Sequence, residues 1–268
     1  MGFQQLLTEA VKYFTIHGYS NPHAMQDWMM RLRDAAESDM VPLALVDKRI
    51  QRSLGAVFMR GTRPERVKRE HPGVPSFTPQ MLPFSLKDEL NKRILISSDL
   101  IRLNRDAAVE KTLQRFAGWA TSVPEGGSKV VDKAEVKETI GKSLAQLKYE
   151  ERRLLTDQGH KLMASINDVI AMDNDAIAAI WHDRGAEDHA YDARPDHLAR
   201  SGKVYAIRSS WAHKEGLIDK GAGYTDAMTA PGEEVYCSCS YEYLYNVDDL
   251  PTDMLTAKGR KWLETKEP

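Results

Sequence analysis

The chain has 268 residues, of which 42% are apolar and 28% charged, and its formal net charge is −2. These values are typical of a globular protein with a substantial core, in one large or two small domains. The near-neutral charge excludes an acidic disordered chain and a protein that binds nucleic acid through a global basic field.

The sequence favours a protein of a reducing compartment without a membrane partner. No window approaches 18 uninterrupted apolar residues, so we expect no transmembrane helix. Residues 1–5 lack the basic and apolar regions of a signal peptide, which predicts that the protein stays in the cytoplasm where it is made. The two cysteines, Cys237 and Cys239, are too close in sequence for an unstrained disulfide, and neighbouring thiols favour reducing conditions.

The N-terminal region, residues 1–59, predicts helices. Apolar residues recur at near-helical spacing from Phe3 to His17, and Gly18 follows them. A second helix is expected to begin with Asn21 as its cap and Pro22 at its first position. A third helix is predicted for residues 43–59.

Residues 60–83 interrupt this pattern with five prolines and two glycines, which predicts an extended arm or linker. Its basic side chains are candidates for contact with a portal protein or with a DNA backbone: Arg63, Arg66, Lys68 and Arg69. Glu65 and Glu70 dilute this charge, and a solvated face is the simpler interpretation.

Central helices are predicted for residues 84–145. One spans about 85–120, and a second begins after Asp132, which forms a plausible capping pair with Glu135. A further helix from about 149 to 172 opens the next segment.

Residues 146–250 predict a small C-terminal α+β module. Short strands are expected at 176–181, 203–207 and 235–247, and they would form a short antiparallel sheet. In the last strand the aromatic, aliphatic and cysteine residues fall on odd positions and would share one face. Residues 251–268 read as a polar, loosely held tail. The predicted fold class is therefore α+β, with a mostly helical N-terminal two-thirds.

Metal-capable and acid–base-capable side chains concentrate between Trp181 and Pro251. Zinc bound by His189, His197, Cys237 and Cys239 is one interpretation. Residues i and i+2 of a strand lie about 7 Å apart, however, so one metal would need the strand to bend. The favoured interpretation is that both cysteines pack as small apolar residues and that no cofactor is bound.

The segment from Asp192 to His197 also admits two interpretations. An imidazole beside carboxylates can act as a general base, and Arg194 can hold an oxyanion. The favoured interpretation is structural: Arg194 forms a buried ion pair with Asp192, Glu187 or Asp188, and His197 donates to a backbone carbonyl. No phosphate loop, dinucleotide fingerprint, nucleophile elbow or HExxH motif is present, so we do not expect an enzyme.

The order of several residues in this region resembles the phage Mu F-like minor head protein family, also called the head morphogenesis family. The matching features are Trp181, Arg194-Pro195-Asp196-His197, Gly202, Pro231-Gly232 and Cys237-Ser238-Cys239. The resemblance covers about residues 145–250. Many members carry Asn-Cys-Arg-Cys where this chain has Tyr236-Cys237-Ser238-Cys239, and a common Thr-Glu pair aligns near Thr156-Asp157.

The resemblance implies a minor head protein of a tailed double-stranded DNA phage. Such a protein would be made in the bacterial host cytoplasm and lie in the virion head near the portal vertex. Its partners would be the portal protein and the major capsid protein, with packaged DNA as a further contact. The module would be stabilised by a structural cluster of Trp181, Asp192, Arg194, His197, Gly202, Pro231 and Gly232. The alternatives are a metal-dependent hydrolase or transferase that acts on nucleic acid, and a DNA-contacting ejection protein.

Overall fold

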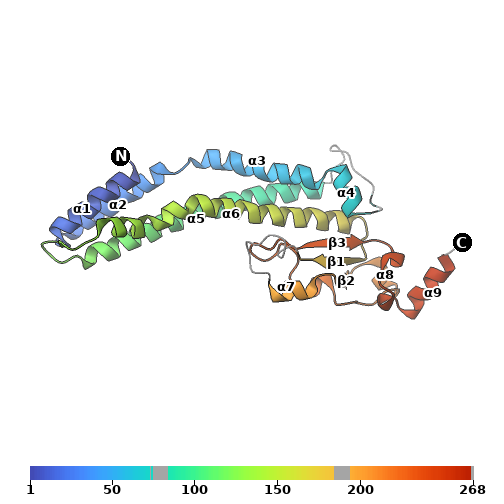
Figure 1. Cartoon of the computed structure of the whole chain (residues 1–268). Coiled ribbons are helices and arrows are strands. Elements are labelled where there is room, and N and C mark those ends of the chain that lie inside the picture. The colour runs from blue at the N-terminus through green and yellow to red at the C-terminus, as the bar shows by residue number, and fades with distance from the viewer. Residues whose placement is uncertain (73, 75–83, 184–193, 267–268) are drawn as a thin grey trace. The chain divides into compact units, whose positions relative to one another are not determined.

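The computed structural model describes residues 1–72, 74, 84–183 and 194–266 (Figure 1). The predicted α+β class is confirmed: helices dominate, and a small antiparallel sheet lies in the C-terminal part. The chain forms two compact units, one of Met1–Ile50 with Ile96–Leu154 and one of Gln51–Leu95 with Leu155–Pro268. The units are not consecutive segments, because three long helices contribute to both: α3 (Leu43–Gly61), α5 (Phe84–Ser122) and α6 (Lys133–Asp173).

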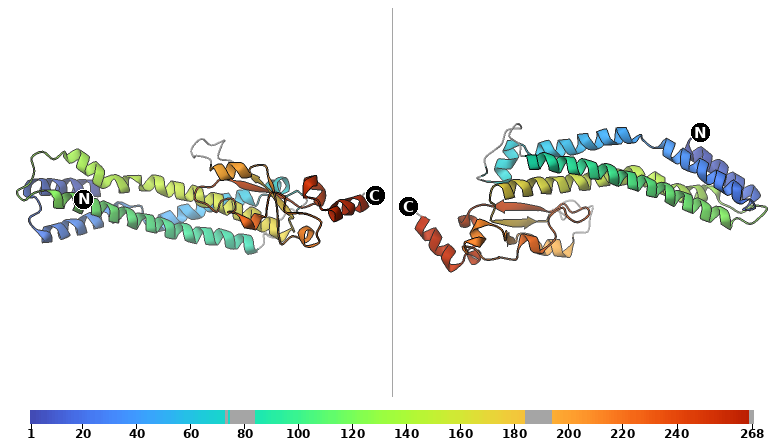
Figure 2. Two further views of the ribbon diagram at one scale, coloured as in Figure 1. Left: turned by 90° about the horizontal axis from the view of Figure 1, so that it is seen from below. Right: turned by 180° about the vertical axis from the view of Figure 1, so that it is seen from behind.

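The first unit contains α1 (Phe3–His17) and α2 (Pro22–Asp39), and both helices have the predicted bounds. Gly18 ends α1 with a φ of 66°, and the Asn21 side chain accepts the His23 and Ala24 N–H groups at the start of α2. Both helices pack against the parts of α5 and α6 that belong to this unit (Figures 1 and 2). The largest fully buried side chains there include Leu7, Phe14, Leu32, Phe116 and Ile140.

Helix α6 is a single element of 41 residues where the sequence predicts two helices. No proline or glycine separates the two predicted stretches, so the backbone hydrogen bonds continue through them. The predicted cap is confirmed, since Asp132 Oδ1 accepts the N–H groups of Ala134 at 2.9 Å and Glu135 at 3.2 Å.

Residues 64–70 form a helix, α4 (Pro64–Glu70), so the predicted extended arm is wrong for this stretch. Pro64 is at the first turn, Glu65 faces the positive end of the helix dipole, and Lys68 and Arg69 lie in the last turn. Val67 is fully buried, which holds the helix against the rest of the second unit. Residues 75–83 of the predicted arm lie outside the described residues.

The sheet belongs to the second unit and has the strand order β2-β1-β3, with both pairings antiparallel. The strands are β1 (Ala178–His182), β2 (Val204–Ala206) and β3 (Ser240–Leu244). Ala179 and Tyr243 form a core with Ala171 of α6, whereas Ala178 and its neighbours form a second core with α8 (Trp211–Lys214). Figure 2 shows the sheet between the end of α6 and these short elements.

The C-terminal stretch is ordered by burial, and the prediction of a loosely held tail is wrong for residues 251–266. Met254 and Leu255 are buried in the core under the sheet, and Trp262 and Leu263 of α9 (Ala257–Lys266) pack against it. The remaining elements are α7 (Pro195–Arg200), η2 (Thr225–Ala227), η3 (Val247–Asp249) and η4 (Thr252–Met254). None of the described helices is long and apolar enough to cross a membrane.

Candidate functional site

The segment before β3 turns sharply, which corrects the prediction of one strand over 235–247. Tyr236 has a φ of 61°, a left-handed backbone that a non-glycine residue rarely adopts, and its N–H donates to Asp157 Oδ1 at 2.6 Å. Cys237 therefore lies in a turn, and strand β3 begins only at Ser240. The geometric objection to a shared site no longer applies, because the two cysteines do not follow one straight strand.

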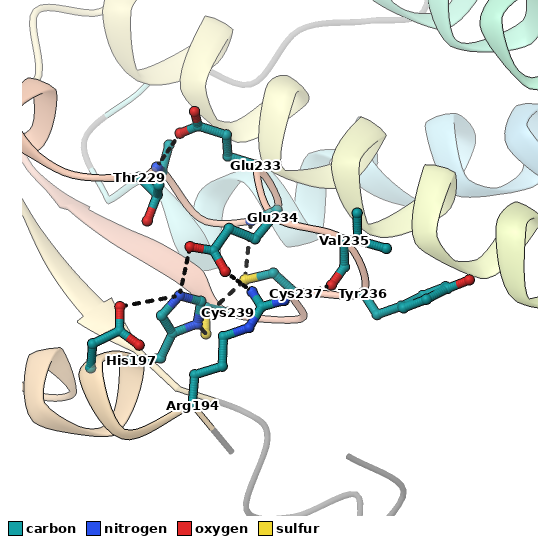
Figure 3. Close-up of polar contacts among 12 residues, drawn as sticks. Arg194, His197, Thr229, Glu233, Glu234, Val235, Tyr236, Cys237 and Cys239 are labelled. Atoms are coloured by element: carbon teal, nitrogen blue, oxygen red, sulfur yellow. Dashed lines mark hydrogen bonds and ion pairs between the residues drawn. The ribbon is translucent and has the colours of Figure 1, made fainter. Parts of the chain in front are cut away.

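Three metal-capable side chains from distant positions converge in this region (Figure 3). His197 Nδ1 lies 3.4 Å from Cys239 Sγ and 3.8 Å from Cys237 Sγ. These nitrogen and sulfur atoms all lie within 4.8 Å of one another, and all three residues are buried. Helix α7 positions the imidazole, and the turn before β3 positions the thiols.

A Pro-Gly turn supports the first thiol. Gly232 has a φ of 77°, as the third position of a type II turn requires, and its N–H points to Cys237 Sγ at 3.4 Å. The Cys239 thiol donates to Asp183 Oδ1 at 3.4 Å. The hydrogen bond between the two thiols lowers the pKa of Cys237 to about 5 and raises the pKa of Cys239. The pair therefore favours a thiolate at Cys237.

Carboxylates surround the other ring nitrogen of the histidine. His197 Nε2 lies 3.8 Å from Glu234 Oε1 and 3.9 Å from Asp196 Oδ2. Arg194 forms an ion pair with Glu234 and donates to the Val235 carbonyl at 3.0 Å. The prediction that His197 donates to a backbone carbonyl is wrong, and the ion pair of Arg194 is half-exposed rather than buried.

Trp181 forms the apolar wall of the cluster and is fully buried. Its ring meets the His197 ring edge to face at a centroid distance of 5.2 Å, and the Arg200 guanidinium lies 5.1 Å from its centroid. Gly202 has a φ of 74° and donates its N–H to the Trp181 carbonyl at 2.8 Å. The tryptophan thus links β1, α7 and the turn after α7.

The structure brings together most of the predicted cluster: Trp181, Arg194, His197, Gly202, Pro231, Gly232, Cys237 and Cys239. The predicted residues His189 and Asp192 lie outside the described residues. Sequence reasoning missed the roles of Asp183, Glu234 and Arg200, whose contacts depend on tertiary structure. One local signal was present, because Asp196 and Arg200 have the i,i+4 spacing of a helical ion pair and lie 2.7 Å apart.

The four basic candidates of residues 63–69 belong to α4 and its cap, apart from this cluster. Arg66 is held by an ion pair with Glu70 and by a 3.2 Å hydrogen bond to Asn167 Oδ1. Arg63, Lys68 and Arg69 are exposed, so their predicted contact with a portal or with DNA stays a prediction.

A polar cleft of about 1080 Å³ lies beside the cluster within the second unit. Cys239 and Asp183 line one part of it, and Arg66, Arg93 and Lys161 are among its basic lining residues. Asp168 also lines the cleft, where burial raises the pKa of its carboxyl group and Tyr243 Oη donates to it at 3.1 Å.

A comparison of the chain with protein-family models, with curated proteins and with solved structures finds no match in any of the three. The site itself offers two kinds of chemistry. Its thiols and imidazole suit a soft or borderline metal ion, and its ion pairs and aromatic contacts cross-link three chain segments.

Proposed function

We propose that the chain is a minor head protein of a tailed double-stranded DNA phage, which binds the portal vertex and assists head assembly. One observation carries the proposal: the residues that carry the family resemblance converge on a single buried cluster. Trp181, His197 and the pair Cys237 and Cys239 come from three separate stretches of the chain, yet their side chains meet. This convergence is what a shared structural core, rather than a chance order of residues, requires.

The position that aligns with the family's Thr-Glu pair adds support. Asp157 on α6 accepts the Tyr236 N–H at 2.6 Å and pairs with Lys161 at 3.1 Å. A carboxylate at this position therefore fixes the turn that places Cys237. The same task would fall to a glutamate in the family pattern, so the partial match preserves the chemistry of the contact.

The first unit offers an apolar surface for a partner. Ile96 and Leu103 lie seven positions apart on α5, so they share a helix face, and both are exposed. Burying such side chains against a partner contributes free energy that they do not supply to the isolated chain. We assign this face to the portal.

Co-sedimentation of the full-length chain with purified portal rings tests the proposal. The paired substitution Ile96→Glu and Leu103→Glu is expected to abolish binding and to leave the melting temperature unchanged, because both side chains are solvent-exposed. Val130→Glu is the matched control, since Val130 is 93% exposed in the same unit but outside α5. Failure of the wild-type chain to bind portals, procapsids and virions would contradict the proposal.

The cleft beside the cluster supports a second candidate, a metal-dependent enzyme that acts on nucleic acid. Basic side chains such as Arg69 and Arg93 line the cleft, and guanidinium groups bind phosphate. Two measurements taken together distinguish the structural function from the enzymatic one. A His197→Ala chain that still supports particle assembly, combined with a wild-type chain that cleaves neither DNA nor RNA in the presence of zinc, would leave only the structural function.

A further inference from the structure

We infer that His197, Cys237 and Cys239 bind one zinc-class divalent cation, which cross-links the C-terminal module. The inference does not depend on head assembly, since it concerns only the residues of the cluster. The donor atoms are His197 Nδ1 and the two sulfurs, which all lie within 4.8 Å of one another. The role we assign to the ion is structural.

The separations between donor atoms match the edges of a zinc tetrahedron. Bond lengths of about 2.3 Å for Zn–S and about 2.0–2.1 Å for Zn–N place sulfur and nitrogen about 3.6 Å apart at a tetrahedral angle. His197 Nδ1 lies 3.4 Å from one sulfur and 3.8 Å from the other. Both measured sulfur–nitrogen edges therefore suit one central ion.

The far side of the imidazole has the surroundings of a metal-ligating histidine. Such a histidine donates its other ring N–H to a carboxylate, which fixes the tautomer and strengthens the ligand. His197 Nε2 faces Glu234 and Asp196 at 3.8 and 3.9 Å. Arg194 and Arg200 in turn pair with these two carboxylates. Neither carboxylate hydrogen-bonds Nε2 at these distances. A proton placed on Nε2 would leave Nδ1 free to coordinate.

Ordinary packing of two apolar cysteines does not account for this arrangement. Small apolar residues in a core need no imidazole nitrogen between them, and a buried histidine normally satisfies its nitrogens with single, well-directed partners. Here one nitrogen faces two sulfurs, and these residues come from α7 and from the turn before β3. The Gly232 N–H, which points to Cys237 Sγ, stabilises a thiolate, the form in which cysteine binds metal.

Two thiolates and one imidazole favour zinc over the hard cations magnesium and calcium, which prefer oxygen ligands. A tetrahedral ion bound by these three side chains takes one further ligand. The ion would join α7 to the turn before β3 in a module whose described sheet has three short strands.

Elemental analysis of the full-length chain, purified from zinc-supplemented culture without chelator, tests the inference. We expect about one zinc ion per chain. Cys237→Ser and Cys239→Ser are expected to lose the metal. His213→Gln is the matched control, because His213 belongs to the same unit but bonds Tyr224 Oη at 3.0 Å instead of a sulfur.

A ligand variant that fails to fold also loses metal, so a second measurement uses a variant outside the thiol pair. Glu234→Gln is expected to fold and to bind zinc about 10-fold to 100-fold more weakly, because it alters the support of the histidine and leaves the three ligands in place. Cobalt(II) added to the demetallated wild type is expected to give thiolate charge-transfer absorption and the strong visible bands of a tetrahedral site.

Wild-type protein that contains no zinc, and that takes up cobalt without thiolate absorption, would overturn the inference. Zinc retained at full stoichiometry by Cys237→Ser and by Cys239→Ser would overturn it as well, since the ion would then lie elsewhere. A chain that does not bind portals would still show the same zinc content and the same cobalt spectrum. The metal inference and the proposed function therefore fail independently.

Discussion

Asp157 shows how a single buried side chain fixes the local path of the chain. Its two oxygens are divided between the Tyr236 N–H at 2.6 Å and Lys161 Nζ at 3.1 Å. Tyr236 has a left-handed backbone, which costs about 1–2 kcal/mol for a non-glycine residue. The hydrogen bond offsets part of that cost.

Asp157→Ala is expected to destabilise the second unit by about 1–3 kcal/mol, because it leaves a partly buried N–H and a partly buried ammonium group without this partner. Equilibrium unfolding in urea measures the change. Asp157→Asn is the control, since its carbonyl oxygen can still accept from Tyr236, and it should lose less. An alanine variant as stable as the wild type would show that the turn does not need the carboxylate.

His71 makes the stability of the second unit depend on pH in a direction that its surroundings determine. The ring is buried, stacks on Tyr243 and meets Tyr245 Oη at 2.6 Å. Burial lowers the pKa of His71 below its usual 6.5, against the opposing effects of Asn167 and Glu70. The unfolded chain therefore takes up a proton at a pH where the folded chain does not.

Stability is expected to fall as the pH drops from about 6.5 toward the lowered pKa of His71, and to be insensitive to this group above that range. Urea unfolding at about pH 7.5 and about pH 5.5 measures the slope. His71→Gln should flatten the slope, whereas His213→Gln should preserve it. An equally steep slope in both variants would assign the effect to another group.

At the scale of elements, two glycines show two different reasons why a position requires glycine, a left-handed backbone and a lack of space for a side chain. Gly202 and Gly232 both have positive φ angles, of 74° and 77°. A Cβ on Gly202 would meet no atom within 4 Å, whereas on Gly232 it would lie 3.2 Å from the Ala164 Cβ and 3.4 Å from the Lys161 Cα. Only the second glycine is needed for close approach to α6.

Gly202→Ala is therefore expected to cost about 1–2 kcal/mol, the price of a left-handed alanine. Gly232→Ala should add about 1–3 kcal/mol of overpacking to a similar conformational cost. Thermal unfolding of the two variants side by side measures the difference. An equal loss of stability in the two variants would indicate that the turn and α6 accommodate the added methyl group without a free-energy cost.

Local sequence signals predicted the elements whose causes are local. Asn21 and Pro22 start α2 and Asp132 caps α6 through hydrogen bonds within three residues, so the pattern was readable. The turn at Tyr236 was not predicted, because its left-handed backbone depends on Asp157, 79 positions away. The last helix was missed since Trp262 gains its partners only in the folded core.

The candidate site also has a part that the sequence predicted and a part that it did not. His197, Cys237 and Cys239 stood out by residue type, and the resemblance placed them in one module. Asp183 and Glu234 were not singled out as neighbours of the cluster, because nothing in a single sequence shows which carboxylates face a given thiol or histidine. Their contacts with Cys239 and His197 arise only when three separate segments meet.

At the scale of the whole molecule, metal removal is expected to act on one unit alone. Hydrogen exchange should quicken about tenfold or more in α7 and in residues 229–244 when a chelator removes zinc, because binding energy in such a site is folding energy. Amides of α1 and α2 belong to the other unit and should be unaffected. Mass spectrometry of exchanged peptides measures both. Equal acceleration in the two units would contradict a local role for the ion.

The passage of three helices through both units has a consequence for biosynthesis. Residues up to Leu154 complete the first unit, whereas the second needs Gln51–Leu95 together with the chain beyond Leu155. During translation the first unit can close while Gln51–Leu95 still awaits its partners. Apolar residues of that stretch, Leu54 and Leu86 among them, stay without their final packing until the ribosome has made the C-terminal module. A chain truncated near residue 154 would keep those surfaces open and invite aggregation or capture by chaperones.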